Sequence, residues 1–508
     1  MSLSLASVVP ATDSRSLHIS AKAVDHMARL QEILTRRRFV QATAAGGLAL
    51  AGFGRTTPAQ SAKPNILFIM ADDLGYADVS CYGQRDYTTP NVDRLAIEGL
   101  KFTHAYANSA VCSATRIALI TGRYQYRLAA GLEEPLGERE SAGIGLPPSH
   151  PTLPSLLKKI GYATSLVGKW HLGALPDFSP LKSGYDHFFG TWFGSADYFN
   201  HGPNSPRPLY EQDVPAERHG YITNLLGDRA VQMVESYARS KEPFLLSLHF
   251  TAPHWPWEGP DDEAESKRIA GHVFDTDGGT QKTYGTMVQS LDANIGRVLQ
   301  TLEFTGLAAN TIVVFTSDNG GERFSKTWPF SGMKTELLEG GLRIPAIVRW
   351  PGRIAAGSVS EQTIITMDWM PTLLAAAGTR MEPSHPPDGE NLLPTLTGRS
   401  TPNPRKLYWR YKAGAQRAVR DGDLKYLRIA GNEFLFDVVN DPRERANLKN
   451  RRKDVFDRLK SDWEGWNATM LPERLRPASY ENPGELMADH YGVTNPPRPD
   501  HGGAVAKP

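Results

Sequence analysis

Cys112 and Arg116 are the first residues in this chain whose types and spacing could do chemistry. They stand four residues apart in VCSATR, just before an apolar run that can form a helix. At that spacing the two side chains share a helical face, so a fixed cation would lie beside the sulfur. A helix N-terminus also favours anions, which indicates a reactive thiol. A small buried cysteine in a core turn is the alternative interpretation.

Four apolar runs elsewhere in the chain are each followed directly by a polar cluster. The runs cover residues 66–70, 163–167, 244–250 and 311–316, and the clusters are Asp72-Asp73, Gly168 to His171, Thr251 to His254 and Ser317 to Gly321. Continuous apolar runs of this length are typical of strands buried on both faces. Ligands of open α/β sheets bind at the carboxyl ends of the strands, so we expect the four clusters to converge. Taken singly, each cluster could be a helix cap or a turn.

The clusters carry complementary chemistry. The hard oxygen ligands, which suit Ca²⁺ or Mg²⁺, are Asp72, Asp73, Asp318 and Asn319. The cations are Arg116, Lys169, Lys334 and the protonated forms of His171 and His254, and both histidines are candidates for proton transfer. A divalent metal with several cations stabilises an oxyanion such as sulfate or phosphate, so the set predicts an ester hydrolase. Thiolate prefers softer metals, which suggests that the Cys112 sulfur does not survive in the mature enzyme.

These residues require a scaffold of alternating strands and helices. Amphipathic helices are expected over 153–160 and 286–302, between the apolar runs, which favours a large mixed, mostly parallel sheet flanked by helices. Short strands over 415–420, 424–429 and 433–437, followed by a helix over 452–466, predict a smaller C-terminal antiparallel sheet plus helix. The predicted divisions are a signal peptide (1–61), a catalytic domain (62–400), a C-terminal α+β subdomain (401–471) and a Pro-rich tail (472–508).

Composition narrows the function classes. A formal net charge of +1 over 508 residues gives no indication of a nucleic-acid partner. Two cysteines are too few for a disulfide framework or a thiolate metal cluster.

The N-terminal segment predicts export. The run TRRRFVQ at residues 35–41 precedes a short Ala/Gly-rich apolar stretch and small residues near Ala59, which is typical of a bacterial twin-arginine signal. The stretch is too short to span a bilayer, so no stable membrane anchor is expected, and the location is the periplasm or the outside of the cell. Twin-arginine export carries folded chains, so any modification would be made in the cytoplasm. Met27 is an alternative start.

Together the motifs resemble the type I sulfatases of the alkaline phosphatase superfamily, arylsulfatase-like, over residues 65–448. The opening strand and metal loop correspond to NILFIMADDLGYADVSCYG, and the C-x-(P/A)-x-R modification motif to VCSATRIALITGRY. The other motifs, in family order, are LVGKWHLG, TAPHWP, SDNGG and GMKTELLEGGLRIPAIVRWPG.

The resemblance implies hydrolysis of aryl or carbohydrate sulfate esters by a modified Cys112. A maturation enzyme would oxidise it to Cα-formylglycine, whose gem-diol attacks sulfur to give a sulfated enzyme that then eliminates sulfate. The implied Ca²⁺ ligands are Asp72, Asp73, Asp318, Asn319 and the modified Cys112. Arg116 and Lys169 would hold the formylglycine, and His171 would assist elimination. His254 and Lys334 would bind sulfate, with His254 as proton donor.

Two alternatives stay open. A phosphonate or phosphate monoester hydrolase shares the implied fold and modification, and an unmodified Cys112 would leave a non-catalytic sulfoglycan-binding protein. Ala114 stands where the motif commonly has proline, so the extent of conversion depends on the maturation system of the host.

Several other residues have mainly structural interpretations. Cys81 and His249 are expected to be buried and structural, whereas Arg343 could equally form an ion pair or touch substrate. Trp192, Trp255 and Trp257 could line a sugar-binding wall or simply pack in the core. Substrate specificity is expected in the loop over 185–219, which contains His201 and Arg207.

Overall fold

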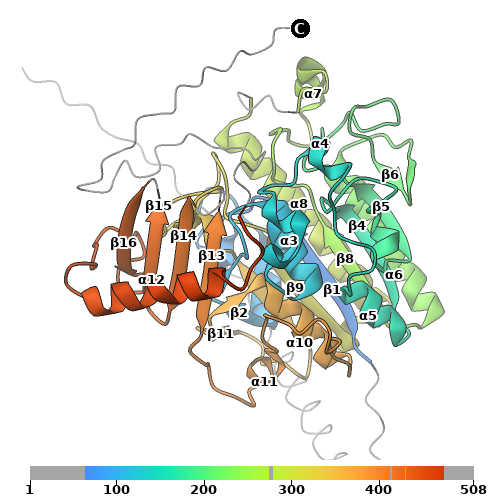
Figure 1. The fold of residues 1–508 in the computed structure, drawn as a ribbon. Helices are drawn as coiled ribbons and strands as arrows, with labels where there is room; N and C mark the ends of the chain where they lie inside the picture. Colours follow the sequence, from blue (N-terminus) through green and yellow to red (C-terminus); the bar gives the residue numbers. More distant parts are fainter. Residues whose placement is uncertain (1–62, 274–277, 412–414, 430, 474–508) are drawn as a thin grey trace, which may run out of the picture. The chain divides into compact units, whose positions relative to one another are not determined.

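The computed structural model describes residues 63–273, 278–411, 415–429 and 431–473 (Figure 1). The predicted signal peptide over 1–61 lies outside the described residues, as does the tail from residue 474 onward. Among the described residues, no helix combines the length and apolar character needed to cross a membrane.

A ten-stranded sheet forms the core of this part of the chain, in the order β11-β2-β10-β9-β1-β8-β4-β5-β6-β7. Its strands are β1 (Asn65–Ala71), β2 (Leu100–Phe102), β4 (Ala163–Lys169), β5 (His187–Thr191), β6 (Tyr210–Glu211), β7 (Val214–Pro215), β8 (Phe244–His249), β9 (Thr311–Ser317), β10 (Ala346–Arg349) and β11 (Ser358–Ser360). Strands β9, β1, β8, β4 and β5 run parallel, whereas β10 and β6 are antiparallel to their neighbours. The prediction of a mixed, mostly parallel sheet is confirmed.

Strand β1 shows why the apolar runs become buried strands. Successive side chains in a strand point to opposite faces of the sheet. Leu67 and Ile69 belong to the core on one face. Ile66, Phe68 and Met70 belong to the core on the other face. Because helices cover both faces, the sequence is continuously apolar rather than alternating.

Helices cover both faces of the sheet. On the face of Leu67 lie α2 (Pro90–Glu98), α6 (Ile222–Ser240) and α8 (Gln281–Phe304). On the opposite face lie α3 (Cys112–Thr121), α5 (Leu153–Lys159) and α10 (Trp369–Ala376). The two predicted helices are confirmed as α5 and α8. Helix α8 begins earlier than expected, because the Thr280 side chain caps it by accepting from the Thr283 backbone N–H.

Short elements complete the part of the chain that contains the large sheet. They are β3 (Ala105–Tyr106), which pairs with β12 (Ile364–Ile365), and the short helices α4 (Glu138–Ser141), α7 (Glu263–Ile269), α9 (Glu339–Leu342) and α11 (Leu393–Leu396).

The C-terminal part is a four-stranded antiparallel sheet with one helix, as the sequence predicts (Figure 1). Its elements are β13 (Lys406–Tyr411), β14 (Gln416–Asp421), β15 (Leu424–Ile429), β16 (Asn432–Asp437) and α12 (Lys453–Asn467). The sequence prediction lacked β13. One face of this sheet packs against α12. The other face shares a core with α3. The division into domains near residue 400 stays a prediction.

Candidate active site

The polar clusters that follow β1 and β9 meet at the carboxyl end of the central sheet. The strand register sets this arrangement, because Ala71 of β1 pairs with Ser317 of β9. The next residue of each strand is an aspartate, and Asp72 and Asp318 consequently lie side by side. The clusters after β4 and β8 reach the same place through Lys169 and His254, whose contacts are described below.

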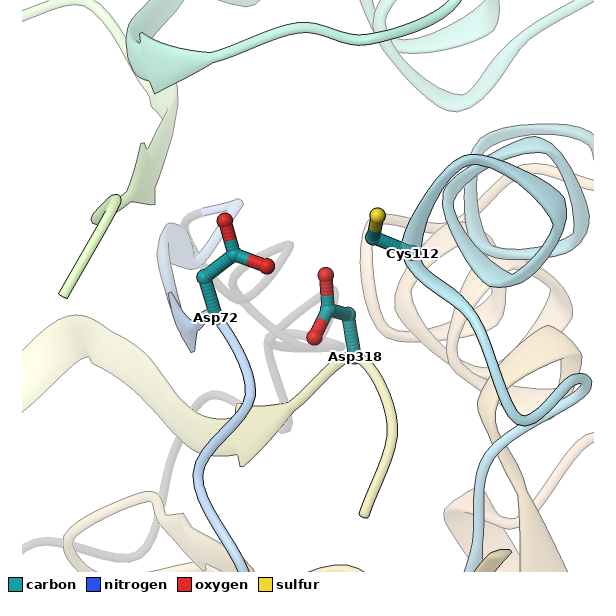
Figure 2. A group of neighbouring side chains, drawn as sticks. All are labelled: Asp72, Cys112 and Asp318. Atoms are coloured by element: carbon teal, nitrogen blue, oxygen red, sulfur yellow. The ribbon is translucent and has the colours of Figure 1, made fainter. Parts of the chain in front are cut away.

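Cys112 is the first residue of α3 and points into the same space (Figure 2). Its sulfur lies within 4.8 Å of a carboxylate oxygen of Asp72 and one of Asp318. Burial raises the pKa of the Cys112 thiol, although Lys169 opposes the rise. A thiol with a raised pKa is protonated at neutral pH, so the surroundings do not favour the reactive-thiolate interpretation.

Arg116 lies one helical turn after Cys112 and is held by a carboxylate. Its Nε and Nη2 donate to Asp318 Oδ2 at 3.1 and 2.8 Å. Its Nη1 donates to the backbone carbonyl of Lys169 at 3.2 Å. Burial alone would raise the pKa of Asp318, but Arg116 and Lys169 outweigh burial and lower it. The guanidinium is thus a fixed positive charge beside the cysteine, as the spacing predicts.

Lys169 forms a second buried ion pair. Its Nζ donates to Asp72 Oδ2 at 2.6 Å, and both side chains are fully buried. Burial and the neighbouring Asp318 raise the pKa of Asp72 well above its usual value, even though Lys169 opposes them. The repulsion between two adjacent carboxylates is the ordinary sign of a cation site.

Lys334 joins a second group of side chains at the same site. Its Nζ donates to Asp73 Oδ2 at 2.6 Å and lies 3.2 Å from His254 Nε2 and 3.4 Å from Glu322 Oε2. The His254 Nδ1 lies 2.7 Å from the backbone carbonyl of Trp255, which can only accept, so Nδ1 carries the hydrogen and Nε2 accepts from Lys334. Burial and Lys334 lower the pKa of His254 well below its usual value. His254 is therefore neutral and accepts a hydrogen bond from the protonated Lys334.

His171 is oriented largely by backbone groups. It has a left-handed backbone, with φ of 58°. Its Nε2 lies 2.9 Å from the backbone carbonyl of Leu136. Burial and Lys169 lower the pKa of His171 well below its usual value. Within the described residues, its buried Nδ1 has no hydrogen-bond partner.

Two groups of side chains in the site could hold a metal ion. One comprises Asp72, Cys112 and Asp318, and the other comprises Asp72, Asp73 and His254. Asn319 lies beside them, since its Nδ2 donates to Asp73 Oδ1 at 2.7 Å. Within the described residues, Asp72 Oδ1 and Asn319 Oδ1 are buried without a hydrogen-bond partner, although Arg116 Nη2 lies 3.7 Å from Asp72 Oδ1. Buried hard oxygens without hydrogen bonds are costly unless they coordinate a cation, so the donors fit a metal.

The structure resolves several of the other sequence candidates. Arg343 is buried and forms an ion pair with Glu339 at 2.7 Å, which is the structural alternative. Cys81 is half-buried, and burial and Asp93 raise its pKa to about 12, consistent with an inert thiol. His249 is buried in β8.

Two of the three candidate tryptophans for a sugar-binding wall are buried in the protein interior. Trp255 and Trp257 are buried, and the guanidinium of Arg323 lies 5.6 Å from the ring centroid of Trp257. Trp192 is half-buried and stacks on Phe193, with ring centroids 3.8 Å apart.

Sequence reasoning missed three residues that the fold brings to the site. They are Ser113, Leu136 and Glu322. Glu322 stands four residues after Asp318, which is a signal that could have drawn attention to it. Leu136 acts through its backbone, so nothing in its side chain could have identified it.

Two family models and several known proteins match this chain. The family model "Sulfatase" matches residues 64–379, and the model "N-sulphoglucosamine sulphohydrolase, C-terminal" matches residues 333–466. Human N-acetylgalactosamine-6-sulfatase is 37% identical over 360 residues, which are 66% of this chain and 66% of that protein. The chain therefore spans about two thirds of the length of this curated relative. Mouse arylsulfatase J is 30% identical over 82% of this chain and 78% of its own length.

A solved structure extends the similarity to three dimensions. Ps i-CgsB, solved in complex with k-i-k-neocarrahexaose, superposes with a TM-score of 0.73 at 29% sequence identity. The match covers 83% of this chain and 95% of that chain.

Proposed function

The chain belongs to the sulfatase family of sulfuric ester hydrolases, and on this premise we propose that it hydrolyses carbohydrate sulfate esters with a modified Cys112 and one bound Ca²⁺. One observation carries the proposal: four carboxylates and three cations are buried together around Cys112. They are Asp72, Asp73, Asp318, Glu322, Arg116, Lys169 and Lys334.

The charge balance favours a divalent cation and an anionic substrate. The four carboxylates exceed the three cations by one formal negative charge, so a bound Ca²⁺ would leave the site with one positive charge. Asp72, Asp73, Asp318, Asn319 and the modified Cys112 would hold the ion. When bound, it would supply Lewis-acid polarisation of the ester and its nucleophile. Hard oxygen donors support Ca²⁺ over a softer metal.

We propose that a maturation enzyme converts Cys112 to Cα-formylglycine in the cytoplasm. The hydrated aldehyde would supply an oxygen nucleophile, which suits the surrounding hard donors better than sulfur does. The raised pKa of the unmodified thiol supports this interpretation, because a protonated thiol would be a weak nucleophile.

The protein's own cations and histidines divide the remaining work. Arg116 and Lys169 hold the nucleophile, each fixed by a carboxylate. Lys334 and His254 bind the sulfate oxygens, and His254 passes a proton to the leaving alcohol, with Lys334 Nζ 3.2 Å away as the source. His171 accepts a proton through Nδ1 when sulfate is released. Each of these roles needs a group already fixed before substrate arrives.

The relatives support a sugar sulfate as the substrate class. One is named for N-acetylgalactosamine-6-sulfate chemistry, and one solved structure holds a neocarrahexaose. Of the three tryptophans, the half-buried Trp192 is available to pack against a sugar ring, whereas Trp255 and Trp257 are buried.

Mass spectrometry of the peptide that contains Cys112 tests the proposal directly. Conversion of the thiol to the aldehyde lowers the mass by roughly 18 Da. The Cys112→Ala variant should lose sulfatase activity, whereas Cys81→Ala, the matched control on the other cysteine, should keep it. A fully unconverted peptide from the native host would instead favour the sulfoglycan-binding alternative.

A substrate panel separates the enzyme alternatives. We expect the purified protein to hydrolyse nitrophenyl sulfate faster than nitrophenyl phosphate or phenyl phosphonate esters. Faster phosphonate turnover would overturn the sulfatase assignment in favour of the phosphonate hydrolase alternative.

We also propose export by the twin-arginine route to the periplasm or beyond. The support is the sequence pattern at residues 35–41. Replacement of Arg36 and Arg37 by lysine should retain the protein in the cytoplasm, as cell fractionation would show, without changing the conversion of Cys112.

A further inference from the structure

Two backbone segments approach the Nε2–Cε1 edge of the His171 ring. Nε2 lies 2.9 Å from the carbonyl of Leu136. A Cβ added at Gly194 would come within 2.7 Å of Cε1 and 2.8 Å of Nε2. This edge of the ring therefore lies in a narrow slot lined by the main chain at Leu136 and Gly194.

The slot selects one tautomer of the imidazole. A backbone carbonyl can only accept a hydrogen bond, so Nε2 must carry the hydrogen that it directs at Leu136. In the neutral ring, Nδ1 then keeps its lone pair. Within the described residues this buried Nδ1 has no other partner, which leaves it available to accept a proton.

The Leu136 backbone also contacts the nucleophile helix. Its N–H donates to Ser113 Oγ at 2.7 Å, and Ser113 directly follows Cys112. One residue's peptide groups thus set the distance between His171 and the start of α3.

Arg207 joins the two segments that form the slot. Its Nη2 makes an ion pair with Glu138, two residues after Leu136. Its Nη1 donates to Ser195 Oγ at 3.0 Å, and Ser195 follows Gly194. The Arg207 side chain is 7% exposed and Ser195 is buried, so their hydrogen bond is shielded from solvent, whereas Glu138 is 46% exposed and its ion pair is partly screened.

We propose that Arg207 is a positioning residue: by fastening Glu138 to Ser195 it keeps the slot closed and holds His171 in the tautomer whose Nδ1 can accept a proton. The inference rests on the proposed function, because it assigns the proton acceptor of that same site. The ion pair and hydrogen bond of Arg207 described above involve neither Cys112 nor the metal ligands.

Kinetics of Arg207→Ala provide the first test. Loosening of the slot should lower kcat by about 10- to 100-fold, the loss expected when a catalytic group moves by about 1 Å. The KM should change less than about threefold, because the sulfate-binding pair Lys334 and His254 is untouched. Arg297→Ala is the matched control, since it breaks a surface ion pair with Asp228 far from the site and should leave both constants unchanged.

A double-mutant cycle tests whether the ion pair is the route of action. If Arg207 acts through Glu138, the double variant Arg207→Ala/Glu138→Ala should lose no more kcat than the single variant Arg207→Ala does. Should Arg207→Ala fail to fold, Arg207→Lys and Glu138→Gln replace it, because both keep side-chain volume while weakening the forked contact.

Nitrogen NMR of ¹⁵N-histidine-labelled protein reads the tautomer without any activity. The resonances of His171, assigned by difference from a His171→Gln variant, should show a protonated Nε2 and an unprotonated Nδ1. This measurement works in the Cys112→Ala background, so it is independent of the sulfatase reaction. Arg207→Ala in that background should shift the resonances toward a mixture of tautomers.

Three results would overturn the inference: an unchanged kcat in Arg207→Ala, a rise in KM alone, or a protonated Nδ1 in the wild-type spectrum. Absence of sulfate-ester hydrolysis by a fully converted wild-type protein would instead refute the proposed function. The two failures are thus distinguishable.

Discussion

Lys425 links the C-terminal sheet to the segment that carries Lys334, and its replacement by methionine should destabilise the protein strongly. Its Nζ lies 2.9 Å from Glu339 of α9 and 2.9 Å from Glu444, and all three side chains are fully buried. Glu339 keeps a second partner in Arg343, at 2.7 Å. Removal of the lysine would take away the cation that pairs with Glu444, so Glu444 must either bind a proton or stay buried as a poorly compensated charge.

The expected loss is about 3–5 kcal/mol near neutral pH, the usual cost of removing one partner from a buried ion pair. The loss of unfolding free energy depends on pH because Glu444 titrates. Burial raises the pKa of Glu444 to about 7, although Lys425 opposes the rise. Without Lys425 the pKa must be higher still.

The direction of the pH effect follows from proton linkage. A carboxyl with a raised pKa in the folded state stabilises the fold below its unfolded pKa and loses that contribution as pH rises through the folded pKa. In the wild type the contribution of Glu444 to stability stops falling near pH 7, but in Lys425→Met it continues to fall at higher pH. The gap between the two proteins should therefore widen above pH 7 by about 1.4 kcal/mol per pH unit.

Urea unfolding followed by tryptophan fluorescence at about pH 7 and about pH 9 measures the gap. The matched control is Lys406→Met on β13 of the same sheet, because Lys406 pairs with Asp462 at 2.7 Å while 36% exposed. It should cost less than about 1 kcal/mol. Adding Glu444→Gln to Lys425→Met should remove the extra pH dependence. Equal losses for Lys425 and Lys406, or a gap that does not change with pH, would refute the reasoning.

Three further predictions concern the site itself. Chelation should abolish hydrolysis, and added Ca²⁺ should restore it. Ca²⁺ at about a hundredfold over its Kd should raise the unfolding free energy by about 2.7 kcal/mol. Full activity after complete chelation would contradict the metal assignment. Asp318→Asn should reduce kcat by more than about 100-fold and also destabilise the fold, because Arg116 loses its anionic partner at 2.8 Å, so an active and fully stable variant would count against it. Gly194→Ala should lower kcat because its Cβ would meet the His171 ring at 2.7 Å, whereas Gly202→Ala, with no atom closer than 3.5 Å, should behave as wild type.

Much of the fold and part of the site were readable in the sequence. The apolar runs, with helices between them, identified β1, β4, β8 and β9, because strands buried on both faces must be continuously apolar. Polar residues placed directly after such strands predict a shared edge, since parallel strands end on the same side of a sheet. Strand β13 was not recognised, although its partners β14 to β16 were.

The sequence by itself determined which residue types would meet: hard oxygens, cations, two histidines and a cysteine at the start of a helix. Only the tertiary structure decided how they pair, because that depends on register and on contacts between residues far apart in the chain. The register of β1 on β9 sets Asp72 beside Asp318, and the slot between Leu136 and Gly194 decides which nitrogen of His171 is free. A backbone carbonyl has the same chemistry in every residue, so no pattern of side chains could have revealed that last contact.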